Sequence, residues 1–130
     1  MKRILLASTS TVYGGTYLSY LQDELIDFFT GIDEILFVPY ARPSGITHDE
    51  YTQIAQQFFN RVGKRIVGLH TFADPKKAIR QAKAIFTGGG NTFVLVNQLY
   101  GLEVMDVLRE AVENGTLYMG TSAGSNIAGQ

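Results

Sequence analysis

The sequence predicts an α/β domain built on a doubly wound, mostly parallel sheet with helices on both faces. Two observations carry this prediction. Short apolar runs alternate with longer amphipathic stretches along the chain, and the apolar runs lack the strict alternation of half-exposed strands. Strands of a parallel sheet are covered on both faces and therefore read as nearly continuous apolar segments. The length of 130 residues fits a single domain, residues 1–130, that can bury a core.

Five short apolar segments are expected to form the strands. In chain order they are RILLAS (3–8), EILFVPY (34–40), RIVGLH (65–70), AIFTGGG (84–90) and TLYMG (116–120). The first of them follows Lys2 and Arg3, as the apolar region of a signal peptide would. That run is too short for a secretory signal, so a strand explains it better.

The best helical pattern is HDEYTQIAQQFFNRVG, between the second and third predicted strands. Ile54, Phe58 and Val62 fall on one face of it, at the spacing of an amphipathic helix. Thr47 and Glu50 stand three residues apart at its start, which is the spacing of a capping box. We therefore expect a helix that begins directly after Thr47.

Two further helices carry end signals. A short helix is expected from Pro75 to Ala82, because Asp74 can cap it and proline suits the first helical position. Another helix is expected before the last strand, where the dipeptide at 114–115, Asn-Gly, supplies a stop signal. Its apolar stripe consists of Leu102, Met105, Leu108 and Val112.

Composition excludes several classes of function. The formal net charge is −1, from 11 basic and 12 acidic residues without a long block of either sign. We therefore expect neither a nucleic-acid partner nor binding to an anionic membrane. The absence of cysteine excludes disulfides, thiolate metal sites and a cysteine nucleophile. No apolar segment has the length needed to span a bilayer, and a cytoplasmic protein is expected.

A nucleophile elbow is indicated after the last predicted strand, where MGTSAGSN contains the pattern G-x-S-x-G. In this motif a serine occupies a tight strand-to-helix turn, so the residues two before and two after it must be small. Gly120 and Gly124 meet that requirement around Ser122. The turn would bring the backbone N–H of Ala123 to the point where an oxyanion forms. The alternative is that Ser122 merely caps the following helix.

A second glycine-rich turn, GGGNT (88–92), follows the fourth predicted strand. It does not fit the dinucleotide fingerprint, because Phe93 stands where G-x-G-x-x-G requires its third glycine. In parallel sheets ligands bind outside the carboxyl ends of the strands, where both turns are expected. The loop can therefore donate a second backbone N–H to the same oxyanion. The alternative is that its glycines only permit a turn with positive φ.

In this order and spacing, the two motifs resemble the peptidase E family of serine peptidases, the aspartyl dipeptidases, which belong to the wider class I glutamine amidotransferase-like fold. TGGGNTFVL and LYMGTSAGSNIA are the specific parts of the resemblance. It extends over most of the chain and includes the Ser8-Thr9-Ser10 end of the first strand, VPYA (38–41), HDEYT (48–52) and LHTFADP (69–75).

The resemblance implies a site and a substrate. Ser122 corresponds to the nucleophile, and the backbone N–H groups of Ala123 and Gly90 correspond to the oxyanion hole. Asn91 and Thr92 lie where the glycine loop meets the substrate. The family hydrolyses dipeptides with an N-terminal aspartate, uses no metal ion or other cofactor, and is cytoplasmic. The expected partner is therefore a small peptide.

The other members of a catalytic triad are not evident. In the family, the histidine and its acidic partner follow the serine, but only AGSNIAGQ follows Ser122. Of the two histidines present, His70 is expected at the active edge of the sheet, and His48 is expected in solvent at a helix N-terminus. We therefore expect the N-terminal portion of a longer peptidase, inactive alone. Its exposed apolar surface would favour self-association or a complementing C-terminal segment.

Other functions stay open at this point. A non-catalytic domain could bind small anionic ligands in the same crevice, and a cyanophycinase-like hydrolase would share the elbow. Glutamine amidotransfer is disfavoured because it uses a cysteine nucleophile. A carboxylate substrate is normally held by a basic side chain. Arg42, in the loop after VPYA, is the basic residue near a strand end that could do so.

Overall fold

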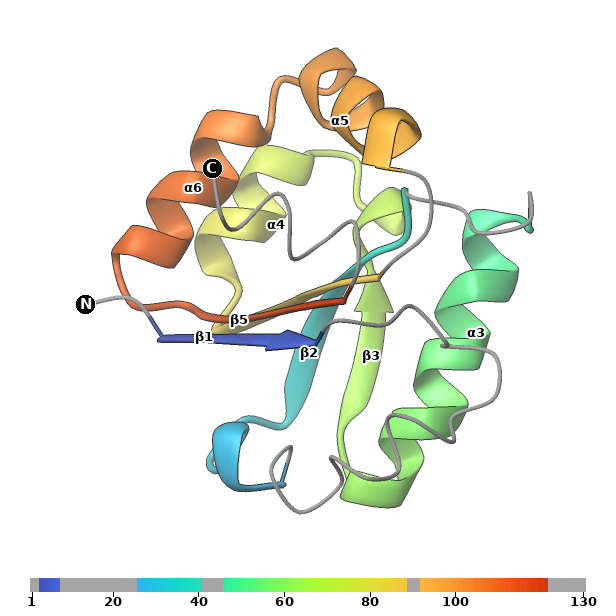
Figure 1. The fold of residues 1–130 in the computed structure, drawn as a ribbon, viewed down its shortest axis with the longest axis vertical. Coiled ribbons are helices and arrows are strands. Elements are labelled where there is room, and N and C mark those ends of the chain that lie inside the picture. Colours follow the sequence, from blue (N-terminus) through green and yellow to red (C-terminus); the bar gives the residue numbers. More distant parts are fainter. Residues whose placement is uncertain (1–2, 8–25, 41–45, 89–91, 122–130) are drawn as a thin grey trace.

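The computed structural model describes residues 3–7, 26–40, 46–88 and 92–121 (Figure 1). These residues form a five-stranded sheet with the strand order β1-β5-β4-β2-β3. All neighbouring strands of this sheet run parallel. The strands are β1 (Arg3–Ala7), β2 (Glu34–Val38), β3 (Arg65–Gly68), β4 (Ala84–Thr87) and β5 (Leu117–Thr121). The predicted fold class is confirmed, and a strand lies at each predicted segment.

Helices cover both faces of the sheet, as the sequence predicts. Among the described residues, the helices include α3 (His48–Phe59), α4 (Pro75–Gln81), α5 (Thr92–Gly101) and α6 (Met105–Glu113). Figure 1 shows α3 on one side of the sheet and α4 and α6 together on the other. Short 3₁₀ turns at Asn60–Val62 and Leu69–Thr71 follow α3 and β3.

The predicted helix starts are confirmed by their hydrogen bonds. The Thr47 hydroxyl accepts a hydrogen bond from the Glu50 backbone N–H, and the Glu50 carboxylate accepts one from the Thr47 N–H. This is a complete capping box, which satisfies two N–H groups that α3 itself cannot pair. At the start of α4 the Asp74 carboxylate accepts a hydrogen bond from the Lys77 N–H at 3.1 Å, and Pro75 occupies the first helical position.

The end of α6 also follows the prediction. Met105, Leu108 and Val112 are buried along one stripe of the helix. Leu102 differs from the prediction only in lying in the turn before α6, where it is partly buried against the same core. Gly115 has a φ of 98°, in the left-handed region that glycine adopts without strain. The helix therefore stops where the sequence provides a residue that can reverse the chain.

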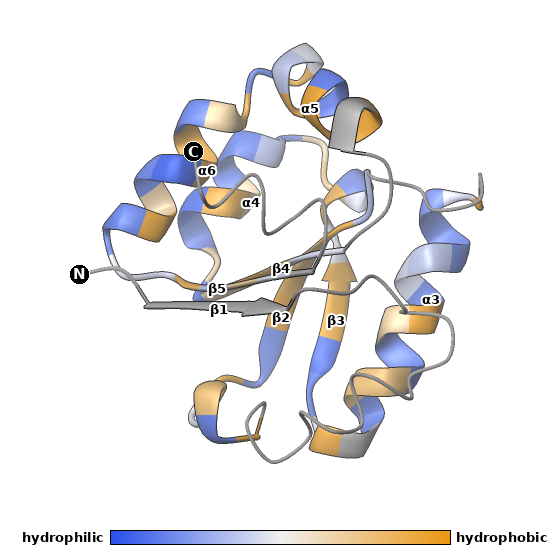
Figure 2. Ribbon diagram, in the orientation of Figure 1, coloured by the Kyte–Doolittle hydropathy of each residue, from blue (hydrophilic) through white to orange (hydrophobic). Residues whose placement is uncertain are grey.

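Alternate residues of the strands enter two separate cores, because successive side chains of a strand point to opposite faces. The core on the side of α4, α5 and α6 receives Leu36, Val38, Ile85 and Tyr118. The core on the side of α3 receives Ile35, Phe37, Ile66, Ala84, Phe86, Leu117 and Met119. Figure 2 shows hydrophobic residues through the middle of β2 and β3 and hydrophilic ones at their amino ends, where Arg65 pairs with Glu34.

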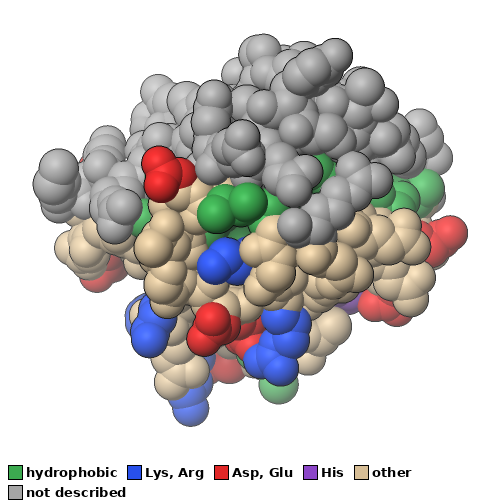
Figure 3. Space-filling view, turned by 90° about the horizontal axis from the view of Figure 1, so that it is seen from below, with side chains coloured by type: hydrophobic (Ala, Val, Ile, Leu, Met, Phe, Trp, Pro, Cys, Tyr) green, Lys and Arg blue, Asp and Glu red, His purple; other side chains and the backbone are tan. Residues whose placement is uncertain are grey.

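The surface carries charges of both signs. On the face seen in Figure 3, the described Lys and Arg side chains lie beside Asp and Glu side chains. This mixed arrangement agrees with the small formal net charge of −1. Among the helices that the structure describes, none has the length and apolar character to cross a bilayer.

Candidate active site

The carboxyl ends of β4 and β5 lie next to each other in the middle of the sheet. Thr87, the last residue of β4, is paired with Gly120 of β5. Because the two strands are parallel, the glycine-rich sequence after β4 and the G-x-S-x-G sequence after β5 leave the same edge of the sheet. Neighbouring strands are about 4.8 Å apart. The two motifs therefore start one strand spacing from each other, at the edge where α/β proteins bind ligands.

Most of the predicted site residues follow these strand ends in the sequence. Those outside the described residues are Arg42, Gly90, Asn91, Ser122 and Ala123. Thr92 is the first residue of α5, but its side chain is not described. Their roles stay predictions. The structure describes the strand ends that precede them in the sequence, namely those of β2, β4 and β5.

Gly88, the first glycine of the loop after β4, is required by packing. It is buried, and its backbone N–H donates a hydrogen bond to the Val38 carbonyl at 3.2 Å. A Cβ atom at Gly88 would lie 2.4 Å from the Tyr51 hydroxyl oxygen and 2.6 Å from the ring carbon that bears it. The φ of Gly88 is not positive. The explanation by positive φ is therefore wrong for this glycine, which is needed because Tyr51 of α3 occupies the space of a side chain.

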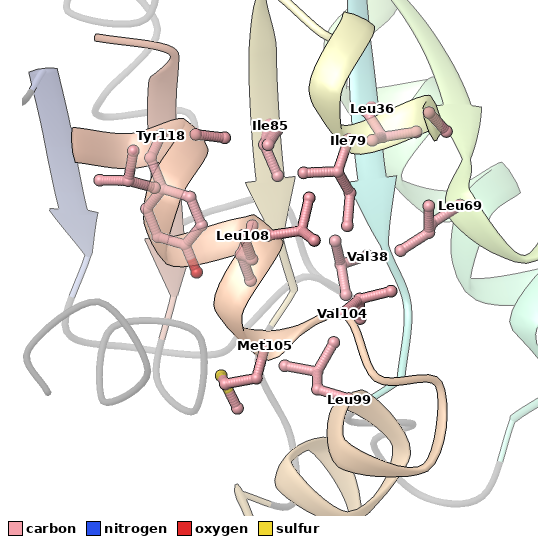
Figure 4. Packing of buried hydrophobic residues seen from close by; sticks show 14 of the residues in the cluster. Leu36, Val38, Leu69, Ile79, Ile85, Leu99, Val104, Met105, Leu108 and Tyr118 are labelled. Atoms are coloured by element: carbon pink, nitrogen blue, oxygen red, sulfur yellow. The ribbon is translucent and has the colours of Figure 1, made fainter. Parts of the chain in front are cut away.

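Tyr118 approaches the same strand end from the other side of the sheet. Its side chain is fully buried, and Figure 4 shows its hydroxyl pointing toward the carboxyl ends of the strands. Burial raises the pKa of the Tyr118 phenol well above its usual range. The phenol is therefore neutral across the physiological pH range.

A second polar group surrounds the carboxyl end of β3. The Nε2 atom of His70 lies 2.6 Å from a carboxylate oxygen of Asp49 in the first turn of α3. The ring of His48 lies between those of Tyr40 and His70, with centroids 5.0 and 5.4 Å away. The prediction that His48 is solvated is therefore wrong, because its side chain is half-buried and its Nε2 atom is fully buried. Tyr40 and His70 follow two different strands, β2 and β3, and sequence spacing alone does not place them together.

His70 is too far from β5 to act as the base for a serine there. Strand β3 is separated from β5 by β2 and β4, a distance of about 14 Å for three strand spacings. A general base must lie about 3 Å from the proton that it accepts. In addition, Nε2 of His70 already contacts Asp49. The structure therefore supports the view that His70 is a strand-end residue held by its neighbours.

The described residues contain a cavity of about 340 Å³ at the other end of the sheet. It is lined by the first residues of β2 and β4, by the end of α4 and by Phe72. This position is remote from the strand ends that precede the two glycine motifs. Among the described residues, no group of three or more His, Asp or Glu side chains is placed to hold a metal ion.

Residues 4–130 match the model of peptidase family S51. A Drosophila melanogaster protein named "Probable alpha-aspartyl dipeptidase" is 42% identical over 130 residues, which cover 98% of this chain and 53% of that protein. Peptidase E of Haemophilus influenzae is 43% identical over 133 residues, covering 99% of this chain and 60% of the relative. The chain thus spans about half to three-fifths of the length of these curated relatives.

A solved structure shares the fold. The crystal structure of a protein from Listeria monocytogenes EGD-e superposes with a TM-score of 0.72 at 22% sequence identity. The superposition covers 95% of this chain and 60% of the other. It supports the arrangement of strands and helices described above.

Proposed function

Because this chain belongs to peptidase family S51, we propose that it forms the nucleophile-bearing part of a serine dipeptidase. In this proposal Ser122, on a nucleophile elbow after β5, attacks the peptide carbonyl of dipeptides whose first residue is aspartate. The name of the Drosophila relative supports this substrate class. The backbone N–H groups of Gly90 and Ala123 stabilise the oxyanion, and the enzyme acts in the cytoplasm.

The observation that carries the proposal is the pairing of Thr87 with Gly120. Ser122 follows Gly120 by two residues, and Gly90 follows Thr87 by three, so both motifs begin at adjacent strand ends on one edge of the sheet. That adjacency is what an oxyanion hole shared between an elbow and a glycine loop requires. Each donor of such a hole contributes about 10²–10³-fold to kcat in serine peptidases.

The same edge offers a position for substrate recognition. Val38, at the end of β2, is paired with Thr87. The sequence after β2, which contains Arg42, therefore starts one strand spacing from the glycine loop. We propose that Arg42 binds the side-chain carboxylate of the aspartate, since a guanidinium matches a carboxylate with two parallel hydrogen bonds. Asn91 and Thr92, at the start of α5, complete this side of the pocket.

The chemistry also requires a base. A base must accept the Ser122 proton as the hydroxyl oxygen bonds to the carbonyl carbon. It must then return a proton to the leaving amine before water releases the acyl group. The chain has two histidines, and both lie in the group around the carboxyl end of β3. The proposal therefore requires a base from outside these 130 residues.

The test is a turnover assay with an aspartyl p-nitroanilide, run on the 130-residue chain and on the full-length product of its gene. We expect turnover by the full-length product, a loss of several orders of magnitude in Ser122→Ala, and little effect of the matched control Ser125→Ala. Arg42→Ala should raise KM for the aspartyl substrate and leave a neutral substrate unaffected.

Two results would contradict parts of the proposal. Turnover that survives Ser122→Ala in the full-length product would defeat the serine mechanism. Robust, Ser122-dependent turnover by the 130-residue chain would show that the base lies within it, and His70→Ala would then be the next variant to assay.

A further inference from the structure

The side chain of Gln56 in α3 binds the outer edge of β3. Among the described strands, β3 lies at one margin of the sheet and pairs with β2 on its inner side. On that side the Arg65 backbone N–H donates a hydrogen bond to the carbonyl of Asp33, directly before β2, at 2.9 Å. Because successive peptide groups of a strand alternate in direction, the groups flanking Arg65 face away from β2. These groups are the Lys64 carbonyl and the Ile66 N–H.

Both of these outward groups form hydrogen bonds with the Gln56 amide. Nε2 of Gln56 donates to the Lys64 carbonyl at 3.0 Å, and the Ile66 N–H donates to Oε1 of Gln56 at 2.7 Å. A residue of a neighbouring parallel strand would bind the same two groups with its own N–H and C=O. Since a side-chain amide carries the same kinds of donor and acceptor as a peptide unit, Gln56 substitutes for one residue of a further strand.

The orientation of this amide is determined by its partners. The Lys64 carbonyl can only accept a hydrogen bond and the Ile66 N–H can only donate one, so the nitrogen and oxygen of Gln56 cannot exchange places. The second N–H of Nε2 donates to Oδ1 of Asn60 at 2.9 Å, in the 3₁₀ turn after α3. Figure 1 shows α3 beside β3, and Gln56 is half-buried between them. The amide is therefore held on the edge of the strand by three hydrogen bonds.

An exposed strand edge is a template on which another chain can add a strand. We propose that Gln56 blocks the β3 edge against pairing with a second copy of this chain. The excluded partner is β3 of another molecule, because two identical edges can pair antiparallel about a twofold axis. At the other end of the strand the Gly68 carbonyl accepts a hydrogen bond from the Thr71 hydroxyl at 2.7 Å. This inference goes beyond the proposed function and does not depend on it.

The first test measures the edge itself by hydrogen exchange with residue resolution. Gln56→Met keeps the length of the side chain and removes both hydrogen-bonding groups. In the full-length gene product, at a concentration too low for self-association, the Ile66 amide should exchange about 5- to 10-fold faster than in wild type. The Arg65 amide, which is bonded toward β2, should keep its rate. Gln56→Glu keeps an acceptor for the Ile66 N–H and should retain most of its protection.

The second test measures self-association by sedimentation velocity over a series of concentrations. We expect the dissociation constant of Gln56→Met dimers to lie at least about 10-fold below that of wild type, because the open edge can form several backbone hydrogen bonds. Gln57→Met is the matched control, since it places the same apolar side chain on the next residue of α3, which is exposed. It should associate no more than wild type. In the Gln56→Met dimer the Ile66 amide should regain protection.

Three results would overturn the proposal. Unchanged Ile66 exchange in dilute Gln56→Met would show that the amide does not cover the edge. Equal association of Gln56→Met and Gln57→Met would assign the effect to apolar surface alone. Association of Gln56→Met without renewed protection of Ile66 would place the contact elsewhere. Neither test uses turnover, so a failure of the serine dipeptidase proposal would leave these results unaffected.

Discussion

The two faces of the sheet are packed with different kinds of side chain. On the face covered by α3, half of the described buried residues are aromatic, namely Phe29, Phe37, Tyr51, Phe58, Phe59 and Phe86. On the face covered by α4, α5 and α6, they are mainly aliphatic, as the close-up in Figure 4 shows. Of the described residues in this second core, Tyr40 and Tyr118 are aromatic.

The rings of the α3-side core come from α3, β2 and β4, and from Phe29, which precedes β2. These rings meet at an angle, as Phe59 and Phe86 do with centroids 5.3 Å apart. On the other face, branched side chains from several helices share the volume. We infer that stability depends on fewer, larger contacts on the α3 face.

The largest expected effect comes from truncating a ring on the α3 face. Phe86 is fully buried in β4 and contacts both Phe37 and Phe59. Phe86→Ala removes the contact surface of several rings at once and leaves a large cavity in this core. We expect a loss of about 4 kcal/mol in the free energy of unfolding, measured by urea denaturation.

The matched variant on the opposite face is Leu108→Ala in α6. Leu108 is 1% exposed and packs among aliphatic neighbours from several elements. Because smaller side chains from three helices can close around the gap, we expect a loss of about 3 kcal/mol. A larger loss for Leu108→Ala than for Phe86→Ala would contradict the contrast between the faces.

Sequence reasoning succeeded where one segment determines its own structure. Apolar runs predicted the strands, and Thr47 with Glu50 predicted the capping box, because these depend on neighbouring residues along the chain. The parallel direction followed from the alternation of strands and helices. Even the turn at Gly115 could be predicted, since a helix end of this kind needs a local stop signal.

Features that depend on contacts between distant segments were not predictable. For the glycines after β4, the sequence offered a turn with positive φ as the alternative to an oxyanion-binding loop, whereas at Gly88 a ring from α3 excludes a side chain. His48 looked like an exposed residue of a first helical turn, whereas Tyr40 and His70 cover it. A parallel strand order that is not the chain order brings such groups together, and a single sequence does not reveal that order.

The carboxyl end of β4, at Gly88, allows a more specific test of the packing against α3. Gly88→Ala places a methyl group against Tyr51, so we expect a loss of about 2 kcal/mol from overpacking. Gly101, the last residue of α5, is the control, because nothing lies within 4 Å of its ideal Cβ position and its φ is not positive. Gly101→Ala should raise stability by up to about 1 kcal/mol. Equal effects of the two substitutions in thermal unfolding would contradict the steric role of Tyr51.

The helix caps give a smaller contrast between the faces. Thr47→Ala removes the hydroxyl that accepts the Glu50 N–H at the start of α3, the helix that supplies Tyr51, Phe58 and Phe59 to its core. We expect a loss of about 1 kcal/mol. Asp74→Ala removes the corresponding cap of α4, which shares its face with two other helices. Asp74→Ala should lower the free energy of unfolding by less than Thr47→Ala does. A larger loss for Asp74→Ala in urea denaturation would contradict a greater contribution of α3 to stability.

The smallest effect expected is a dependence of stability on pH that arises at the α3 cap. Hydrogen bonds with Thr47, first through its backbone and then through its side chain, lower the pKa of Glu50. A carboxyl group whose pKa is lower in the folded state stabilises the fold above its ordinary pKa of about 4.3. That contribution is lost as the pH falls through the folded-state pKa. Urea denaturation of wild type and Glu50→Gln should therefore differ at pH 7, and the difference should shrink toward pH 3. A difference that is constant over this range would show that the charge on Glu50 does not support the helix that holds the aromatic face.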